Sequence, residues 1–178
     1  FAMIAATLTS RLADAGIDKK AVTAFALTLL VYNLKFLWAP VIDRVRLPVL
    51  APLLGPRRAW LLVAGVMTMA AITWLGLADP VTNLTGVVWA ALAVAFAGAT
   101  YDIVIDAFRI ESLSPEQLGV GSGMSQYGWR IGSNAAGALA LVLAERAGWN
   151  SAYLACTLFA VPALLAGLLL GEPRRHRE

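Results

Sequence analysis

Long apolar blocks alternate with short polar connections along the chain. Residues 59–78, 80–101 and 147–171 contain no Asp, Glu, Lys, Arg or His, and the blocks 21–42 and 117–144 contain one such residue each, Lys35 and Arg130. An α-helix needs about 20 predominantly apolar residues to cross a bilayer. Each of the five blocks reaches that length, so the pattern predicts five whole membrane-spanning helices.

The first apolar stretch, residues 1–10, is too short to cross a bilayer, and we interpret it as the end of a truncated first helix. Continuous apolar blocks indicate helices, because a membrane strand would alternate in polarity over about 10 residues. We therefore expect an all-α membrane bundle followed by a basic tail, 172–178. The expected spans are about 1–12, 20–42, 59–78, 82–107, 118–144 and 149–171.

Composition supports this class. Of the 178 residues 60% are hydrophobic and 14% charged, whereas soluble domains carry about a quarter charged residues. The net charge of +3 is too small for a nucleic-acid surface. Cys156 and His176 are single, so the sequence offers no disulfide, metal cluster or nucleophile system. We expect neither an enzyme nor a bound cofactor or metal.

The connections differ in charge, which predicts the orientation. Eight arginines fall on one side and four basic residues on the other, so the first side is expected to be cytoplasmic, as are both ends of the bundle. The first set is Arg44, Arg46, Arg57, Arg58, Arg109, Arg174, Arg175 and Arg177; the second is Arg11, Lys19, Lys20 and Arg146.

Ionisable residues within a span are costly and usually face a cavity or a partner. Asp102, Asp106 and Arg109 are spaced to share one helical face. Two carboxylates at this spacing repel, so one keeps a proton unless a cation such as Arg109, Lys35 or Arg130 is close. Two interpretations stay open: a carboxylate that carries a coupled proton, and an ion-pair clamp between helices.

Arg130 lies near the middle of its span, where Gln126 and Asn134 give the helix a polar face that Tyr127 borders. The planar guanidinium suits a substrate carboxylate or phosphate, and the alternative is a permanent pair with an acid of the protein. Lys35 either lines the cavity or extends its ammonium group to the membrane surface. The expected substrate and proton pathway comprises Lys35, Asp102, Gln126, Tyr127, Arg130 and Asn134.

Asp43-Arg44, followed by Gly55-Pro-Arg57-Arg58, resembles the cytoplasmic loop signature of the major facilitator superfamily, with a longer loop than usual. Further motifs are similar to its muropeptide permease branch, which has acetyl-CoA transporter relatives. They are Lys35-Phe-Leu-Trp-Ala-Pro40, Tyr101-Asp-Ile-Val-Ile-Asp-Ala107, Gly119-Val-Gly-Ser-Gly123 and Tyr127-Gly-Trp-Arg-Ile-Gly132.

The resemblance implies the six-helix N-terminal half of a transporter, with the site between it and a missing C-terminal half. It further implies proton-coupled import of muropeptides, which are amino sugars linked to a short peptide, across the cell inner membrane. Another cargo (acetyl-CoA, a drug or a siderophore) and a non-transporting or homodimerising scaffold remain as alternatives. The implied cytoplasmic gate residues are Asp43, Arg44, Arg57, Arg58, Asp106 and Arg109.

Overall fold

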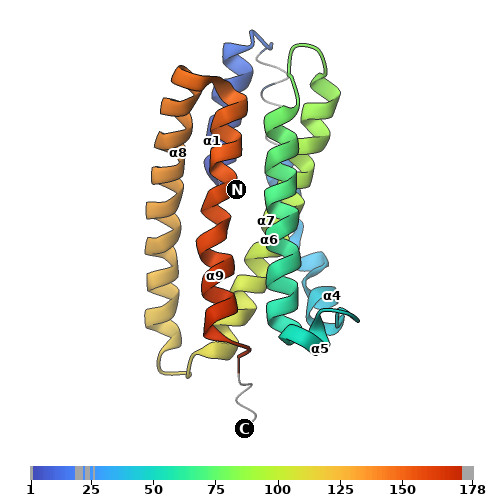
Figure 1. Cartoon of the computed structure of the whole chain (residues 1–178), viewed down its shortest axis with the longest axis vertical. Helices are drawn as coiled ribbons and strands as arrows, with labels where there is room; N and C mark the ends of the chain where they lie inside the picture. Colours follow the sequence, from blue (N-terminus) through green and yellow to red (C-terminus); the bar gives the residue numbers. More distant parts are fainter. Residues whose placement is uncertain (1, 19–21, 23–24, 26, 174–178) are drawn as a thin grey trace.

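A computed structural model describes residues 2–18, 22, 25 and 27–173, and every element in these ranges is a helix. The helices lie roughly along one long axis (Figure 1). Their order is α1 (Ala2–Asp14), α3 (Leu27–Asn33), the 3₁₀ turn η1 (Leu34–Leu37), α4 (Ala39–Arg44), α5 (Ala51–Leu54), α6 (Pro56–Leu77), α7 (Leu84–Ser112), α8 (Leu118–Thr157), the 3₁₀ turn η2 (Leu158–Ala160) and α9 (Val161–Leu170).

Three segments of the described chain are long and apolar enough to cross a membrane: 56–77, 84–112 and 118–170. The third is a hairpin, because Gly148 has a left-handed backbone (φ 81°) that interrupts α8. Residues 149–170 then return beside 118–147 (Figure 1). The expectation of an all-α membrane fold is therefore confirmed, while the six-helix count stays a prediction.

The predicted span 20–42 does not form one continuous helix where it is described. From residue 27 onward it consists of α3, η1 and α4, and residues 20, 21, 23, 24 and 26 lie outside the described residues. Pro40 lies in the first turn of α4 and lacks the N–H that a continuing helix would need. The indole N–H of Trp38 donates to Thr100 Oγ1 (3.2 Å) and holds the break against α7.

Two apolar clusters form the core along α6 and α7. One joins α1, α6 and α7 to Tyr153, and the other joins Ile42 of α4 to α6 and Val104 of α7. Small residues bring the helices close, as membrane helix interfaces favour. A Cβ added at Gly76 would lie 2.9 Å from the Cβ of Tyr153, so α6 and the second arm of α8 approach too closely for a side chain.

The two ends of this bundle are named here after an arginine that lies at each. At one end, called here the Arg57 end, α6 begins and α7 ends, and α4 and α5 lie beside the start of α6 (Figure 1). At the other, the Arg11 end, α1 and α6 end and α8 turns back at Gly148. The polar side chains of the candidate site lie between α3, α7 and α8 and at the Arg57 end.

Candidate functional site

A polar pocket of about 330 Å³ opens between α3, η1, α7 and α8. It brings together two carboxylates and two cations from α7 and η1, which a hydrocarbon environment would strongly penalise if they were unpaired. Its lining residues are Tyr32, Lys35, Asp102, Asp106, Arg109, Ser125, Gln126 and Trp129. The pocket therefore combines charged side chains with a space large enough for water between the helices.

Lys35 is the cation that pairs with Asp102. The Lys35 Nζ donates to Asp102 Oδ2, and the Tyr32 hydroxyl donates to the same oxygen at 3.0 Å. The two charged side chains keep 33% and 37% of their surface exposed. The structure thus resolves the open choice of cation in favour of Lys35, and it leaves the pair accessible to water and ligand from the pocket.

Asp106 has a separate partner one turn further along the same helix. Arg109 Nη2 lies 3.0 Å from Asp106 Oδ1, an i,i+3 pair within α7. Asp102 and Asp106 therefore each have their own cation. These cations compensate the expected repulsion between the two carboxylates. Asp106 and Arg109 belong to the polar pocket, rather than joining the Arg57 end as the gate assignment expects.

Of the residues predicted on α8, Gln126 lines the pocket and the other three do not. Gln126 lines the pocket together with Ser125 and Trp129. Tyr127, Arg130 and Asn134 are exposed and do not line it. At 100° per residue, Ser125 and Trp129 share one side while these three lie on the opposite side. Within the described chain no carboxylate forms an ion pair with Arg130.

At the Arg57 end, two carboxylates join Arg57 of α6 to α4 and α7. Its Nη1 lies 2.8 Å from Asp43 Oδ1 in the last turn of α4. Its Nε and Nη2 donate to Glu111 of α7 at 3.0 and 2.6 Å, a two-bond geometry that only a guanidinium offers. Arg57 is buried, whereas the Asp43 side chain keeps half of its surface exposed.

Glu172, which follows α9, contacts the first turn of α6 at the same end. Its carboxylate accepts the backbone N–H of Arg57 (2.9 Å) and of Arg58 (3.1 Å), two donors that the first turn of α6 leaves free. Gly55, with φ 91°, leaves room for it, because a Cβ there would lie 2.4 Å from the Glu172 carboxylate. Arg58 also donates to the carbonyl of Leu168 in α9.

Sequence reasoning identified Arg57, Arg58 and Asp43 at this end but missed both glutamates. The predicted fourth span ends at 107, whereas α7 continues to Ser112 and thereby carries Glu111 toward Arg57. Glu172 follows α9 directly, and its approach to α6 depends on tertiary packing alone. Arg44 is exposed and forms no ion pair with a carboxylate of the described residues, so its gate role stays a prediction.

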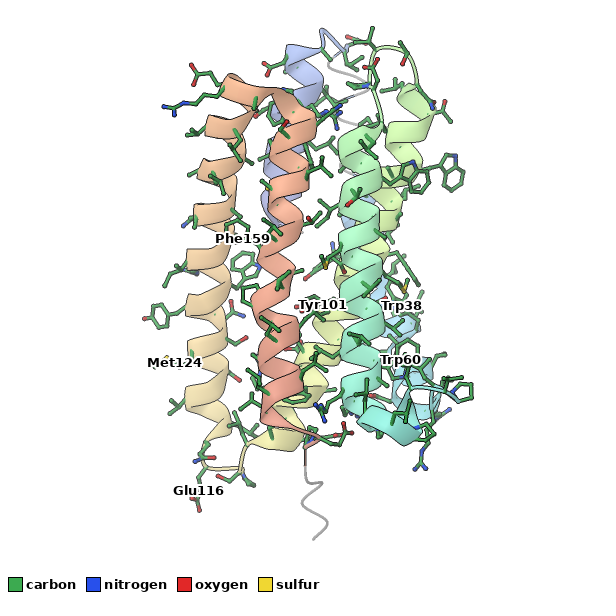
Figure 2. The ribbon with its side chains drawn as sticks, viewed as in Figure 1. Trp38, Trp60, Tyr101, Glu116, Met124 and Phe159 are labelled. Carbon is green, nitrogen blue, oxygen red and sulfur yellow. The ribbon has the colours of Figure 1, made fainter. Side chains whose placement is uncertain are left out.

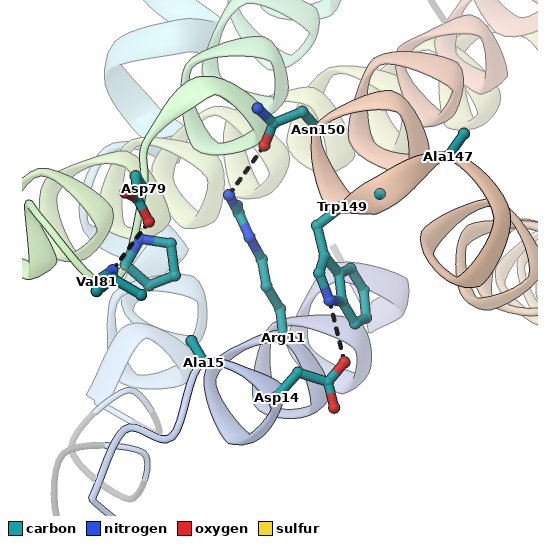
Figure 3. A pocket seen from close by; sticks show the side chains of 10 residues that line it. Arg11, Asp14, Ala15, Asp79, Val81, Ala147, Trp149 and Asn150 are labelled. Carbon is teal, nitrogen blue, oxygen red and sulfur yellow. Dashed lines mark hydrogen bonds between the residues drawn. The ribbon is translucent and has the colours of Figure 1, made fainter.

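Arg11 binds the end of α6 at the Arg11 end. From the sequence, Arg11 counts only as one charge of a connection, which does not suggest this role. The buried guanidinium donates to the carbonyls of Leu75 (2.6 Å) and Ala78 (2.7 Å) at the C-terminus of α6. It also reaches Asn150 Oδ1 at 3.4 Å, and Trp149 donates to Asp14 at 3.1 Å (Figure 3). Arg11 thus satisfies carbonyls that a helix end leaves without partners.

Comparison with known proteins identifies the family. The family model of the Major Facilitator Superfamily matches residues 1–178. The chain is 35% identical over 173 residues to the anhydromuropeptide permease of Escherichia coli (strain K12), covering 97% of the chain and 34% of that relative. It is 30% identical over 178 residues to the putative transporter AmpG 4 of Rickettsia felis, covering 99% of the chain and 43% of that relative.

The chain therefore spans well under half the length of these two relatives. Its three apolar segments of membrane length agree with the membrane class expected from composition. The resemblance to the muropeptide permease branch is confirmed at the level of family and relatives. This chain belongs to the major facilitator superfamily and is similar to anhydromuropeptide permeases, which supports a multi-pass membrane protein.

Proposed function

We propose that the chain is the N-terminal half of an inner-membrane permease that imports muropeptides together with protons. Alternating access would come from rocking of this bundle against a C-terminal half, with the cargo between them. Both ends of the bundle would face the cytoplasm, as the charge bias of the connections indicates. The observation that carries the proposal is the Lys35–Asp102 pair, with Tyr32, in a polar pocket between membrane helices.

The pair offers a direct way to couple a proton to an anionic substrate. While Asp102 is ionised it occupies the ammonium group of Lys35. Protonation of Asp102 removes that competitor, so a substrate carboxylate gains access to Lys35. Each ligand then strengthens the binding of the other, which is the reciprocity that linkage requires. The partial exposure of both side chains supports this role over that of a sealed clamp.

The remaining pocket residues supply neutral contacts. Gln126 and Ser125 offer hydrogen-bonding groups for sugar or peptide, and Trp129 offers an apolar face. Arg130 remains a proposed ligand for an anionic part of the cargo, from the side of α8 that faces away from α7. Asp43, Arg57, Arg58 and Glu111 form the proposed gate, because the ion pairs of Arg57 join α4, α6 and α7 at one end, where Arg58 donates to α9.

The test is proton-driven uptake of an anhydromuropeptide by vesicles that contain the full-length permease. We expect Asp102→Asn to abolish uphill accumulation while downhill exchange persists, because the neutral amide cannot take up or release the proton. Lys35→Met should weaken cargo binding by about tenfold or more, the effect of losing one charge-assisted contact. Glu145→Gln, at an exposed position outside the pocket, is the matched control. Uphill uptake at the normal rate in Asp102→Asn would refute the proposal.

Cargo identity is a separate question within the same assay. Unlabelled acetyl-CoA, siderophore or drug that competes as well as unlabelled muropeptide would indicate another cargo. Cross-linking of the purified protein into dimers, without any uptake, would favour the scaffold alternative.

A further inference from the structure

The connection between α4 and α6 carries apolar side chains that nothing in the described chain covers. We call residues 44–54 the interfacial segment. Val45, Val49 and Leu53 are 45%, 71% and 78% exposed. The segment lies to one side of the bundle at the Arg57 end, beside the start of α6 (Figure 1). Such a patch next to a membrane-length helix calls for an apolar or amphipathic environment.

The same segment presents positive charge without compensation. Arg44 and Arg46 are exposed, and neither makes an ion pair with a carboxylate of the described residues. The neighbouring carboxylate, Asp43, lies 2.8 Å from the buried Arg57 instead. The interfacial segment therefore presents two free guanidinium groups beside three exposed apolar side chains.

The depth of the segment follows from α6. This helix has 22 residues, begins at Pro56 and is long enough to span a bilayer. Its first turn therefore lies near the boundary between acyl chains and headgroups. The indole N–H of Trp60 donates to the carbonyl of Val45 at 2.8 Å and fixes the segment at this level; Figure 2 shows Trp60 there. Tryptophan is enriched at this depth.

We propose that the interfacial segment is a binding site for anionic phospholipid in the leaflet where α6 begins. Val49 and Leu53 enter the outer part of the acyl region, and Arg44 and Arg46 pair with the phosphate and acidic headgroup. This combination of basic and apolar side chains is typical of segments that lie in a membrane interface. A protein partner would have to bury two guanidinium groups and supply carboxylates for them, because an unpaired buried charge is costly.

The test compares lipid retention by the purified full-length protein in native mass spectrometry, with phosphatidylglycerol and phosphatidylcholine of equal chain length. We expect the unsubstituted protein to retain phosphatidylglycerol preferentially. Arg44→Gln/Arg46→Gln should lose about 25-fold of that preference, or fivefold per arginine, from about 1 kcal/mol for each basic side chain near an anionic surface. Arg44→Lys/Arg46→Lys should keep most of it.

Arg146→Gln is the matched control, since Arg146 is an exposed arginine near the opposite end of the bundle. It should leave the lipid preference unchanged. Equal retention of both lipids by the unsubstituted protein would overturn the proposal, as would an unchanged preference in the glutamine double variant.

A second measurement keeps all the arginines in place. An environment-sensitive fluorophore attached at Val49→Cys, in a Cys156→Ala background, should shift to the blue in vesicles that contain phosphatidylglycerol. The shift should weaken as salt screens the arginines. Emission typical of water in both vesicle types, or efficient cross-linking of position 49 to a second protein copy, would contradict a lipid site.

Discussion

Charged side chains inside this bundle fall into two kinds according to how completely the protein surrounds them. Arg11 and Arg57 are buried, and carbonyls or carboxylates of neighbouring helices satisfy them. Lys35 and Asp102 contact one another but keep about a third of their surface exposed. The first kind stabilises one arrangement of helices. The second kind can exchange its partner for a proton or a ligand, as a transport site requires.

The Arg57 cluster leads to a stability prediction. Arg57→Gln leaves the largely buried Glu111 carboxylate without its guanidinium partner, and breaking a buried pair in this way costs about 3 kcal/mol. Arg57→Lys should cost less, because the charge remains while the two-bond geometry is lost. Thermal melting of the purified protein measures both. Arg146→Gln, at an exposed position, is the control, and a melting temperature for Arg57→Gln equal to that of this control would contradict the prediction.

Asp79 leads to a prediction about acid stability. Its carboxylate accepts from the Val81 N–H (3.0 Å) and the Thr82 hydroxyl (2.9 Å) in the turn before α7. These hydrogen bonds lower the pKa of Asp79 below its usual value. A lowered folded-state pKa adds stability above the unfolded pKa of about 3.9, and that stability is lost as the pH falls through the folded pKa.

The melting difference between the unsubstituted protein and Asp79→Ala should therefore stay constant from about pH 7 to 5 and shrink below about pH 4. A difference that persists at the acid end would show that Asp79 acts through packing of the turn. Glu145→Gln, an exposed position, should give no such pH dependence.

The sequence pattern identified Asp102 as a candidate transport residue but did not identify the cation that pairs with it. Asp102 was identifiable because a carboxylate within an apolar block is costly. Lys35, Arg109 and Arg130 were equivalent candidates for its cation, since spacing along the chain does not say which helices adjoin. The break after α3 and the packing against α7 bring Lys35 to Asp102. Trp129 was missed because aromatic residues in a membrane helix usually indicate only packing.

At the scale of elements, α6 is fixed at both of its ends. Glu172 accepts the N–H groups of its first turn, and Arg11 donates to the carbonyls of its last turn. Both partners complement the helix dipole, because the negative Glu172 lies at its positive N-terminal end and the positive Arg11 at its negative C-terminal end. With α7 and the second arm of α8 packed along it, α6 is the rigid centre of this bundle.

Arg11→Met tests the fixation of that C-terminal end. The variant keeps an apolar stem but leaves the carbonyls of Leu75 and Ala78 without their donor. Unsatisfied buried groups of this kind cost about 1–3 kcal/mol, so we expect a matching loss in the free energy of unfolding. The exposed Arg146→Gln is the control. Stability equal to this control would mean that water replaces the guanidinium without cost.

The blocks of apolar residues predicted the bounds of the long helices more accurately than those of the short ones. α6 and α7 begin and end within five residues of the predicted spans. The break at residues 34–38 was not predicted, because Pro40 is tolerated near the end of a membrane helix and the local composition stays apolar. Gly148 turns the chain where Glu145 and Arg146 interrupt the apolar pattern.

At the scale of the whole molecule, the described helices leave one side of the bundle open. Residues 120–134 of α8 are mostly exposed, including Tyr127 and Ile131, both 67% exposed. The polar pocket lies between this arm and α7. The chain spans 34% of the length of the permease from Escherichia coli. The open side suits a C-terminal half that completes the pathway, in keeping with the proposed function.

The most direct test of the pathway is thiol labelling at two adjacent positions of α8 in the full-length permease, in a Cys156→Ala background. Ser125 lines the polar pocket, whereas Met124 is 66% exposed and lies on the outer side of α8 (Figure 2). We expect a membrane-impermeant thiol reagent to label Ser125→Cys and muropeptide to protect this position, whereas Met124→Cys should be neither labelled nor protected. An unreactive Ser125→Cys, or equal reactivity and protection at both positions, would contradict this expectation.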